Sequence, residues 1–207
     1  LGRELQATLE GRAGASLRLV VGIADVLPKL IVYRLLEPVL RLGSTQLICH
    51  DDKTERLLAR LALNELDIIL SDVPANPVVK VRAHNHLLGE CGVSFVGTAK
   101  IVAAHRRNFP KSLDGAPFLL PMEGTSLRRS LDVWFDSEEI RPMVRGEFGD
   151  WDLFEVFGQA GAGIFAVPTA VEEEVKRQHH VRLLGRVESI RERFYAISVD
   201  RKLKHPA

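Results

Sequence analysis

The stretch Gly89-Glu90-Cys91-Gly92-Val93-Ser94-Phe95-Val96-Gly97-Thr98 lies a little before the middle of a chain of 207 residues. Its closely spaced glycines, Gly89 and Gly92, and the alternation of Val93 and Phe95 predict an extended segment that can bend. The strand and helix signals on each side of it are sufficient for a small α/β lobe. We therefore predict that this stretch is the first crossover between two lobes.

Composition limits the class of protein. Hydrophobic residues make up 46% and charged residues 27% of the chain, which are ordinary values for a globular protein. The net charge of +1 offers no whole-chain argument for binding nucleic acid or an acidic surface. No apolar run approaches the roughly 18 residues of a membrane span, so we expect no membrane partner.

The first residues and the cysteines indicate the cellular context. Leu1-Gly2-Arg3-Glu4 contains neither an initiator Met nor a signal peptide, so we expect a piece of a longer, cytoplasmic protein. Cys49 and Cys91 are far apart and lack metal-ligand spacing. We expect them to be small buried hydrophobes from a reducing compartment, with a structural disulfide as the alternative.

The first residues carry leucines at four-residue spacing, Leu1, Leu5 and Leu9, which predict the end of an amphipathic helix. Gly11 and Gly14 then stop it. This pattern favours a connector to an upstream segment.

The first lobe repeats a strand, a loop and a helix. Apolar runs predict strands at 17–23, 45–50 and 66–70. Asp25 is a candidate N-cap for a helix that has Pro28 in its first turn, and Asp52 with Glu55 resembles a capping box. Such alternation predicts a parallel sheet, so the loops that follow the strands should gather at its carboxyl edge, where these sheets bind ligands.

The second lobe has strand signals at 117–120, 143–147 and 164–167, with Asp150 as the N-cap of the helix between the last two. A short strand around 87–88 and one near 181–184 are also predicted. The last apolar segment, 194–199, could extend the second sheet or cross back to the first. The second alternative would make a hinged clamp.

These motifs resemble the effector-binding domain of LysR-type transcriptional regulators. The resemblance is carried by the central Gly-Glu-Cys-Gly-Val-Ser-Phe and the leucine helix before it. Further matches resemble the branch that regulates sodium/proton antiporter genes: Gly22-Ile-Ala-Asp25, Ile69-Leu-Ser-Asp72, Gly146-Glu-Phe148 and His205-Pro-Ala207. It implies an α/β fold of the periplasmic-binding-protein type II-like kind, with two Rossmann-like lobes joined by two crossover strands and an inducer cleft between them.

The resemblance also implies a domain division. Residues 1–14 would form the end of a linker helix and a hinge, 15–92 with 193–207 the first lobe, and 93–192 the second lobe. The winged helix-turn-helix would lie upstream of Leu1, so we expect this chain to contact DNA only through that domain. Hinge residues would be Glu90, Cys91, Gly92 and Tyr195.

Carried over by position, the resemblance points to effector-binding residues in two sets. They are Ala24, Asp25, Ser71 and Asp72 in the first lobe, and Glu123, Gly124, Thr125, Ser126, Glu147, Phe148 and Asp150 in the second. Helix N-termini at Asp25, Thr125 and Asp150 would suit an anion. However, eight Asp or Glu and two Arg give residues 132–155 a net charge of −6, which favours a cation.

The antiporter-regulator resemblance implies sodium or lithium as the activating signal, with a small effector as the alternative. These hard cations prefer oxygen ligands, which Asp25, Asp72, Glu147 and Asp150 could supply. The simpler interpretations are N-caps for Asp25, Asp52 and Asp150, a turn at Ser71-Asp72, and a solvated acidic face. We expect His84, His86 and the pair His179-His180 to lie in surface turns.

We therefore predict the sensing module of a LysR-type activator, without a cofactor, that forms a homodimer or homotetramer. The candidate dimer surface is the first-lobe helix, with Val26, Leu30, Tyr33 and Leu35. The alternative is a free solute-binding protein with the same clamp fold. An enzyme has little support, because no nucleophile elbow, metal-binding His/Cys set or catalytic carboxylate pair occurs in the sequence.

Overall fold

The computed structural model describes residues 17–43, 45–75 and 83–199. The chain divides into two compact units, unit 1 (Leu1–Leu88 and Phe194–Ala207) and unit 2 (Gly89–Arg193). The predicted leucine helix with its glycine hinge in 1–14, and the motif His205-Pro-Ala207, lie outside the described residues. No helix in the described part of the chain has the length and apolar content that are needed to cross a membrane.

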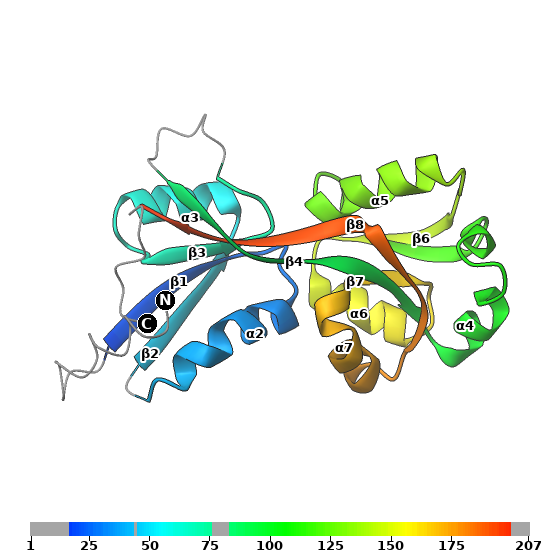
Figure 1. Cartoon of the computed structure of the whole chain (residues 1–207), viewed down its shortest axis with the longest axis horizontal. Helices are drawn as coiled ribbons and strands as arrows, with labels where there is room; N and C mark the ends of the chain where they lie inside the picture. Colours follow the sequence, from blue (N-terminus) through cyan, green and yellow to red (C-terminus); the bar gives the residue numbers. More distant parts are fainter. Residues whose placement is uncertain (1–16, 44, 76–82, 200–207) are drawn as a thin grey trace. The chain divides into compact units, whose positions relative to one another are not determined.

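Unit 1 is built on three parallel strands with a helix on each side (Figure 1). Its elements are β1 (Leu17–Ala24), α2 (Lys29–Leu40), β2 (Thr45–Asp52), α3 (Thr54–Ala62) and β3 (Ile68–Ser71). β1 lies between β2 and β3 and is parallel to both, with Ala24 opposite Asp52 and Ile23 opposite Leu70. The carboxyl ends of the three strands therefore lie at one edge, as the alternation of strand and helix signals predicted.

α2 begins later than the sequence pattern indicated. It starts at Lys29, with Pro28 in the N-cap position and no side-chain cap. Asp25 is not the N-cap: it lies in the preceding turn, where its backbone N–H donates to the carbonyl oxygen of Asp52 at 3.1 Å. Pro38 does not end the helix, which continues to Leu40.

The capping box proposed for Asp52 and Glu55 is also wrong. α3 has Lys53 at its N-cap position and no side-chain cap hydrogen bond, because Asp52 is still the last residue of β2. The Oδ1 atom of Asp52 instead accepts a hydrogen bond from the backbone of Lys53 at 2.8 Å. Three buried leucines, Leu57, Leu58 and Leu61, fasten α3 to the sheet.

Two long strands connect the units along the chain. β4 (His84–Gly97) contains the whole Gly89–Gly97 stretch, and β8 (Arg182–Ser198) contains both of the last two predicted strand segments. The six-stranded sheet has the order β2-β1-β3-β8-β4-β7, so β4 and β8 are neighbours (Figure 1). The chain passes from unit 1 to unit 2 within β4 and returns within β8.

Unit 2 contains a second parallel pair of strands. Its other elements are α4 (Ala99–His105), η1 (Lys111–Leu113), β5 (Pro117–Pro121), α5 (Ser126–Ser137), β6 (Met143–Phe148), α6 (Trp151–Gln159), β7 (Phe165–Pro168), η2 (Thr169–Val171) and α7 (Glu172–Gln178). β5 and β6 are parallel, with Leu120 opposite Glu147 and Pro121 opposite Phe148. Their carboxyl ends, and the loops that follow, therefore lie side by side.

Aromatic side chains dominate the core of unit 2. Phe95, from the central stretch, is fully buried and lies 5.4 Å from Phe118 and 5.3 Å from Trp134, measured between ring centroids. Phe135 packs edge-on against Phe118 at 5.2 Å. Trp134 and Phe135 both belong to this core, because each is less than 10% exposed.

Several smaller predictions are wrong. His86 is half-buried within β4, where Nε2 lies 3.1 Å from Oγ of Ser198, and His84 also belongs to that strand rather than to a turn. His179 is only 8% exposed. Cys49 is exposed and Cys91 is half-buried, and both are free thiols.

Candidate functional site

The predicted effector residues of unit 1 lie at the carboxyl edge of its parallel strands. Ala24 ends β1 and is fully buried, and Asp25 follows it with an exposed side chain. Ser71 ends β3 and is fully buried, with its Oγ atom accepting a hydrogen bond from the backbone of Val73 at 3.2 Å. This hydrogen bond is typical of a turn, which is the simpler of the two interpretations of Ser71-Asp72. It spans Asp72, which lies between the two bonded residues.

The predicted effector residues of unit 2 lie at the end of β6, in the loops after β5 and β6, and at the first residue of α5. Gly124 has a φ of +88°, a left-handed conformation that favours glycine and lets the chain turn from β5 into α5. The backbone of Met122 donates to the carbonyl oxygen of Phe148 at 2.8 Å and so ties the two loops together. Glu123 and Glu147 thus come from neighbouring strand ends.

Two helix N-termini predicted in this region, at Thr125 and Asp150, are confirmed, and a side chain caps each of them. The Thr125 side chain accepts from the backbone N–H of Arg128 at 3.3 Å and donates to the carbonyl oxygen of Met122 at 3.0 Å. Asp150 caps α6 by accepting from the backbone of Leu153 at 2.8 Å. Each cap satisfies a helix N–H that lacks an intrahelical partner, which fixes the orientation of the helix end beside β5 and β6.

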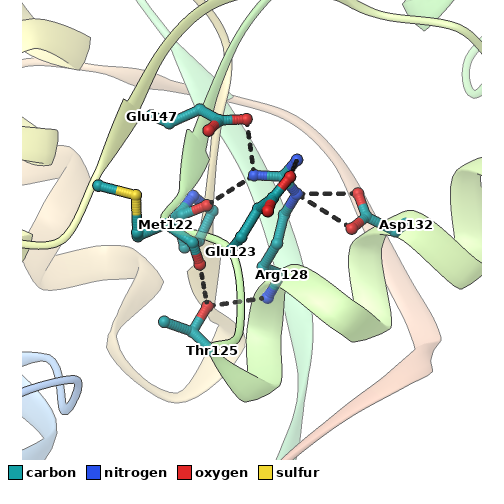
Figure 2. Close-up of polar contacts among 7 residues, drawn as sticks. Met122, Glu123, Thr125, Arg128, Asp132 and Glu147 are labelled. Atoms are coloured by element: carbon teal, nitrogen blue, oxygen red, sulfur yellow. Dashed lines mark hydrogen bonds and ion pairs between the residues drawn. The ribbon is translucent and has the colours of Figure 1, made fainter.

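Arg128, which no sequence motif indicated, organises these loops (Figure 2). Its side chain is 11% exposed. Nη1 donates to Glu147 at 2.8 Å and to the carbonyl oxygen of Pro121 at 3.1 Å. Nε donates to both carboxylate oxygens of Asp132, at 2.9 and 3.0 Å. Arg128 therefore ties the ends of β5 and β6 to the first turns of α5.

A fourth charged residue near this guanidinium, Glu123, is held less firmly. Oε1 of Glu123 lies 4.0 Å from Nη2 of Arg128, beyond hydrogen-bond range, and its side chain is 82% exposed. Nη2 donates no hydrogen bond within the described part of the protein. We name Arg128, Glu123, Asp132 and Glu147 the arginine cluster; three carboxylates and one guanidinium give it a formal charge of −2.

The electrostatics of the arginine cluster keep Arg128 charged. Burial lowers the pKa of Arg128, but the hydrogen bonds to Asp132 and Glu147 outweigh burial and leave the pKa above its ordinary value. The guanidinium therefore remains a permanent cation that offsets one of the three carboxylate charges of the arginine cluster. The negative charge that the count over residues 132–155 suggested is therefore smaller around Arg128.

The four proposed sodium ligands fall into two pairs. Asp25 and Asp72 belong to the strand edge of unit 1, whereas Glu147 lies at the end of β6 and Asp150 in the loop that follows, both in unit 2. Glu147 uses Oε1 for Arg128, and Asp150 uses Oδ1 for its cap. Within residues 17–43, 45–75 and 83–199, no group of three or more His, Cys, Asp or Glu side chains is arranged to hold a metal ion.

A second buried polar group in unit 2 was also missed. Oε2 of Glu155, on α6, lies 3.1 Å from Nε2 of His179, which follows α7, and both side chains are at most 13% exposed. Nδ1 of His179 lies 3.3 Å from Oε1 of Gln159. The pair His179-His180 looked like a surface turn because both residues are polar, whereas the first of them is buried and contacts Glu155 and Gln159 of α6.

The predicted hinge residues lie on the two long strands. Oε2 of Glu90 accepts from Nε of Arg193 at 3.2 Å, which joins β4 to β8 near the unit boundary. A Cβ atom at Gly92 would come within 2.7 Å of Oε2 of Glu188 on β8, which is the end of an exposed side chain that can move aside. Tyr195 is half-buried and pairs with Ser71 of β3.

The predicted dimer surface lies on α2 and the turn before it. Tyr33 is 56% exposed, whereas Val26, Leu30 and Leu35 are half-buried. Ile31, Val32 and Leu36 form the buried face of the helix. Of the four predicted residues, Tyr33 therefore offers the largest apolar surface to a partner.

Sequence comparison now places the chain among known proteins. Residues 12–207 match the LysR substrate binding domain. The chain belongs to this family. It is 32% identical over 208 residues to the transcriptional activator protein NhaR of Escherichia coli (strain K12), over all of this chain and 68% of that protein. NhaR of Shigella flexneri matches to the same extent.

Solved regulatory domains share the fold. The reduced regulatory domain of OxyR2 from Vibrio vulnificus has a TM-score of 0.66 at 16% identity, over 90% of this chain and 89% of that one. The Synechocystis PCC6803 CcmR regulatory domain in complex with 2-PG has a TM-score of 0.63 at 16% identity, over 89% and 88%. The HypT regulatory domain from Salmonella typhimurium (apo-form) has a TM-score of 0.65 at 13% identity, over 91% and 88%.

These matches confirm the family and the periplasmic-binding-protein type II-like fold that the sequence motifs suggested. LysR regulatory domains bind small effectors and are not enzymes. The chain is therefore the effector-binding regulatory domain of a LysR-type regulator, similar to NhaR at moderate identity.

Proposed function

We propose that this chain is the sensing domain of a cytoplasmic transcriptional activator of sodium/proton antiporter genes, and that sodium or lithium is its signal. The observation that carries the proposal is the 32% identity to the activator NhaR along the whole chain. DNA would be contacted only by the winged helix-turn-helix that the family resemblance implies upstream. Protomers would associate as a homodimer or homotetramer.

The end of β6 and the loop after it support a cation as the signal. Glu147 presents a second carboxylate oxygen besides the one bound by Arg128, and Asp150 presents one besides its capping oxygen. Both carboxylates are held in place, one by an ion pair and the other by a helix cap. Preorganised oxygen atoms with a surplus of negative charge suit a hard monovalent cation. Asp25 and Asp72 are the corresponding candidates in unit 1.

Titration of the purified chain tests this proposal. We expect sodium or lithium chloride, but not choline chloride at the same ionic strength, to produce saturable heat in calorimetry and a change in tryptophan fluorescence. Glu147→Gln should abolish the sodium-specific part. Asp136→Asn, which removes an exposed carboxylate of α5, is the matched control and should leave it intact. Identical responses to sodium and choline would refute direct cation binding.

A small anionic effector is the second candidate, and one contact favours it. Nη2 of Arg128 has no partner closer than Glu123, at 4.0 Å. A carboxylate effector could displace the exposed Glu123 side chain and receive a charge-assisted hydrogen bond from Nη2. Glu123→Gln should then strengthen effector binding, because it removes a competing carboxylate, whereas the same variant should weaken or leave unchanged the response to sodium.

A further inference from the structure

A separate pocket lies on unit 2, between α5 and β8, with a volume of about 380 Å³. Its volume falls at the lower end of the range for small-molecule sites, about 300–1,000 Å³. Arg129, Ser130 and Trp134 line it from α5, and Ser189, Ile190 and Arg191 line it from β8. We name this hollow the α5–β8 pocket.

The α5–β8 pocket is distinct from the arginine cluster although both use α5. Pocket residues on α5 follow the stripe of 129, 133 and 137, which places them on one face of the helix. Arg128 and Asp132 follow the neighbouring stripe and bond to each other and to the loop ends. The helix therefore presents a net-negative cluster along one stripe and a different surface along the next.

The chemistry of the α5–β8 pocket combines an apolar base with positive charge. Trp134 is 7% exposed and Ile190 is 3% exposed, so both belong to the core and offer only one surface to a ligand. Arg129 and Arg191 come from different elements, and no acidic residue lines the hollow. An apolar base with a few convergent polar groups is the usual composition of a small-molecule site.

The hydroxyl groups of the pocket are available to a ligand. Ser130 and Ser189 make no side-chain hydrogen bond within the described part of the chain, while Ser137 donates to the carbonyl oxygen of Trp134. Arg129 donates through Nη1 to the carbonyl oxygen of Gly124, a neutral partner that leaves its charge uncompensated. Arg191 lies 3.6 Å from the carboxylate of Glu188. That contact is an exposed ion pair, which contributes little and can be exchanged for another anion.

We propose that the α5–β8 pocket binds a small organic acid, with its carboxylate between Arg129 and Arg191 and its apolar body on Trp134 and Ile190. Serine hydroxyls at Ser130 and Ser189 would donate to the carboxylate oxygens. The chain would then have two ligand sites, one at the strand ends and one here. This second site does not depend on which signal the arginine cluster receives.

Amide chemical shifts of the whole chain test the proposal, with benzoate and hexanoate as probes at millimolar concentration. We expect saturable shifts at Ser130, Val133 and Ser189. The double variant Arg129→Gln/Arg191→Gln should weaken binding at least tenfold, and Arg129→Lys/Arg191→Lys should restore most of it. Arg177→Gln/Arg182→Gln removes the same charge from exposed arginines of α7 and β8 outside the pocket and should not change binding.

Two further probes separate the required features. Acetate, which lacks the apolar body, and benzyl alcohol, which lacks the charge, should both bind much more weakly than benzoate. All four altered arginines are exposed, so thermal unfolding of the variants should match that of the unaltered chain. The proposal is overturned if benzoate and hexanoate give no saturable shift at these residues, or if both double Gln variants weaken binding equally.

Discussion

Glu155 and His179 are the residues whose chemistry the surroundings change most. Desolvation, assisted by the charge of Asp152, raises the pKa of Glu155 to about 7. Desolvation also lowers the pKa of His179, with His180 acting in the same direction and Asp152 against it. Because burial disfavours both charged forms, we interpret their 3.1 Å contact as one between uncharged groups just below pH 7, where Glu155 is still mostly protonated.

Glu155→Gln should remove one pH dependence of stability. The folded-state pKa of Glu155 is above its unfolded value, so its contribution to stability is complete below about pH 4.5 and is lost as pH rises through about 7. Relative to the Gln variant, the unaltered chain should lose on the order of 2–3 kcal/mol of unfolding free energy across this window. Urea unfolding at a series of pH values measures it.

Two features of that experiment distinguish Glu155 from other groups. His179 has a lowered pKa, so its own contribution is lost in the opposite direction, as pH falls below its unfolded value of about 6.5. Subtracting the Glu155→Gln curve cancels this effect, because both proteins retain His179. Glu139→Gln alters an exposed carboxylate and should reproduce the unaltered curve. A parallel curve for Glu155→Gln would contradict the raised pKa.

Arg128 is the residue on which the unit 2 loops depend. Arg128→Met would leave the carbonyl oxygen of Pro121 without its donor. It would also leave the carboxylates of Glu147 and Asp132 without the cation that they share. We expect the free energy of unfolding to fall by about 1–3 kcal/mol. Arg128→Lys should recover only part, because an ammonium group cannot reproduce the fork of donors. Urea unfolding measures these changes. The control variant Arg129→Gln, which alters the exposed neighbouring residue, should lower the free energy of unfolding by less than about 0.5 kcal/mol.

At the scale of the element, α2 separates core from candidate interface. Tyr33→Glu places a charge on the exposed face, so we expect light scattering to report monomers while the melting temperature is unchanged. Leu36→Glu should instead unfold unit 1, because Leu36 is 5% exposed. Polar substitutions at the half-buried Leu30 and Leu35 should combine both effects.

The matched control for α2 is Leu63→Glu. Leu63 is 69% exposed and lies directly after α3, so the substitution adds the same charge to another exposed apolar position of unit 1. It should leave the molar mass unchanged. If Tyr33→Glu also leaves the mass unchanged, α2 does not form the interface.

Helix ends show what sequence patterns can and cannot predict. Thr125 and Asp150 were identified correctly because an N-cap bonds to a backbone group only three residues away. Asp25 and Asp52 are aspartates like Asp150, but neither of them caps a helix. The backbone of Asp25 is occupied by a contact to Asp52 on the next strand, and Asp52 remains within β2. A contact across 27 positions leaves no local signal.

Strand lengths were underestimated for a related reason. β8 was predicted as two short apolar segments, although it is one strand of 17 residues. Its middle alternates buried with exposed residues, but one buried position is Glu192, and the exposed positions include Arg191 and Arg193. A strand with a charged outer face and a buried carboxylate resembles a polar loop when only hydrophobicity is considered.

At the scale of the whole molecule, chain order predicted more of the site than residue type did. Parallel strands place their carboxyl ends together, so the loops after β1 and β3 were expected to meet at one edge, and they do. The loops after β5 and β6 meet in unit 2 for the same reason. The arginine cluster was not predictable in this way. Arg128 follows Ser126 and Leu127 in an ordinary helical pattern, and only the neighbouring loop ends turn it into a buried cation.

The division into two units leads to a prediction about folding. Unit 2 is the continuous segment Gly89–Arg193, whereas unit 1 combines two separate segments of the chain. One core cluster, which includes Phe95, Phe118 and Trp134, is built entirely from residues of unit 2. A continuous segment with its own hydrophobic core can fold alone.

We therefore expect the fragment 89–193 to unfold cooperatively in urea, with a free energy of about 5–10 kcal/mol. The matched fragment 1–88 should not, because it lacks Phe194–Ala207: Ile197 belongs to the buried cluster around Leu57, and β8 pairs with β3 at Ile69–Ser71. Joining 194–207 to residue 88 through a short glycine linker should restore its cooperative transition. If 89–193 lacks dispersed amide shifts while 1–88 folds alone, stability is distributed across the units and this division does not describe how the protein folds.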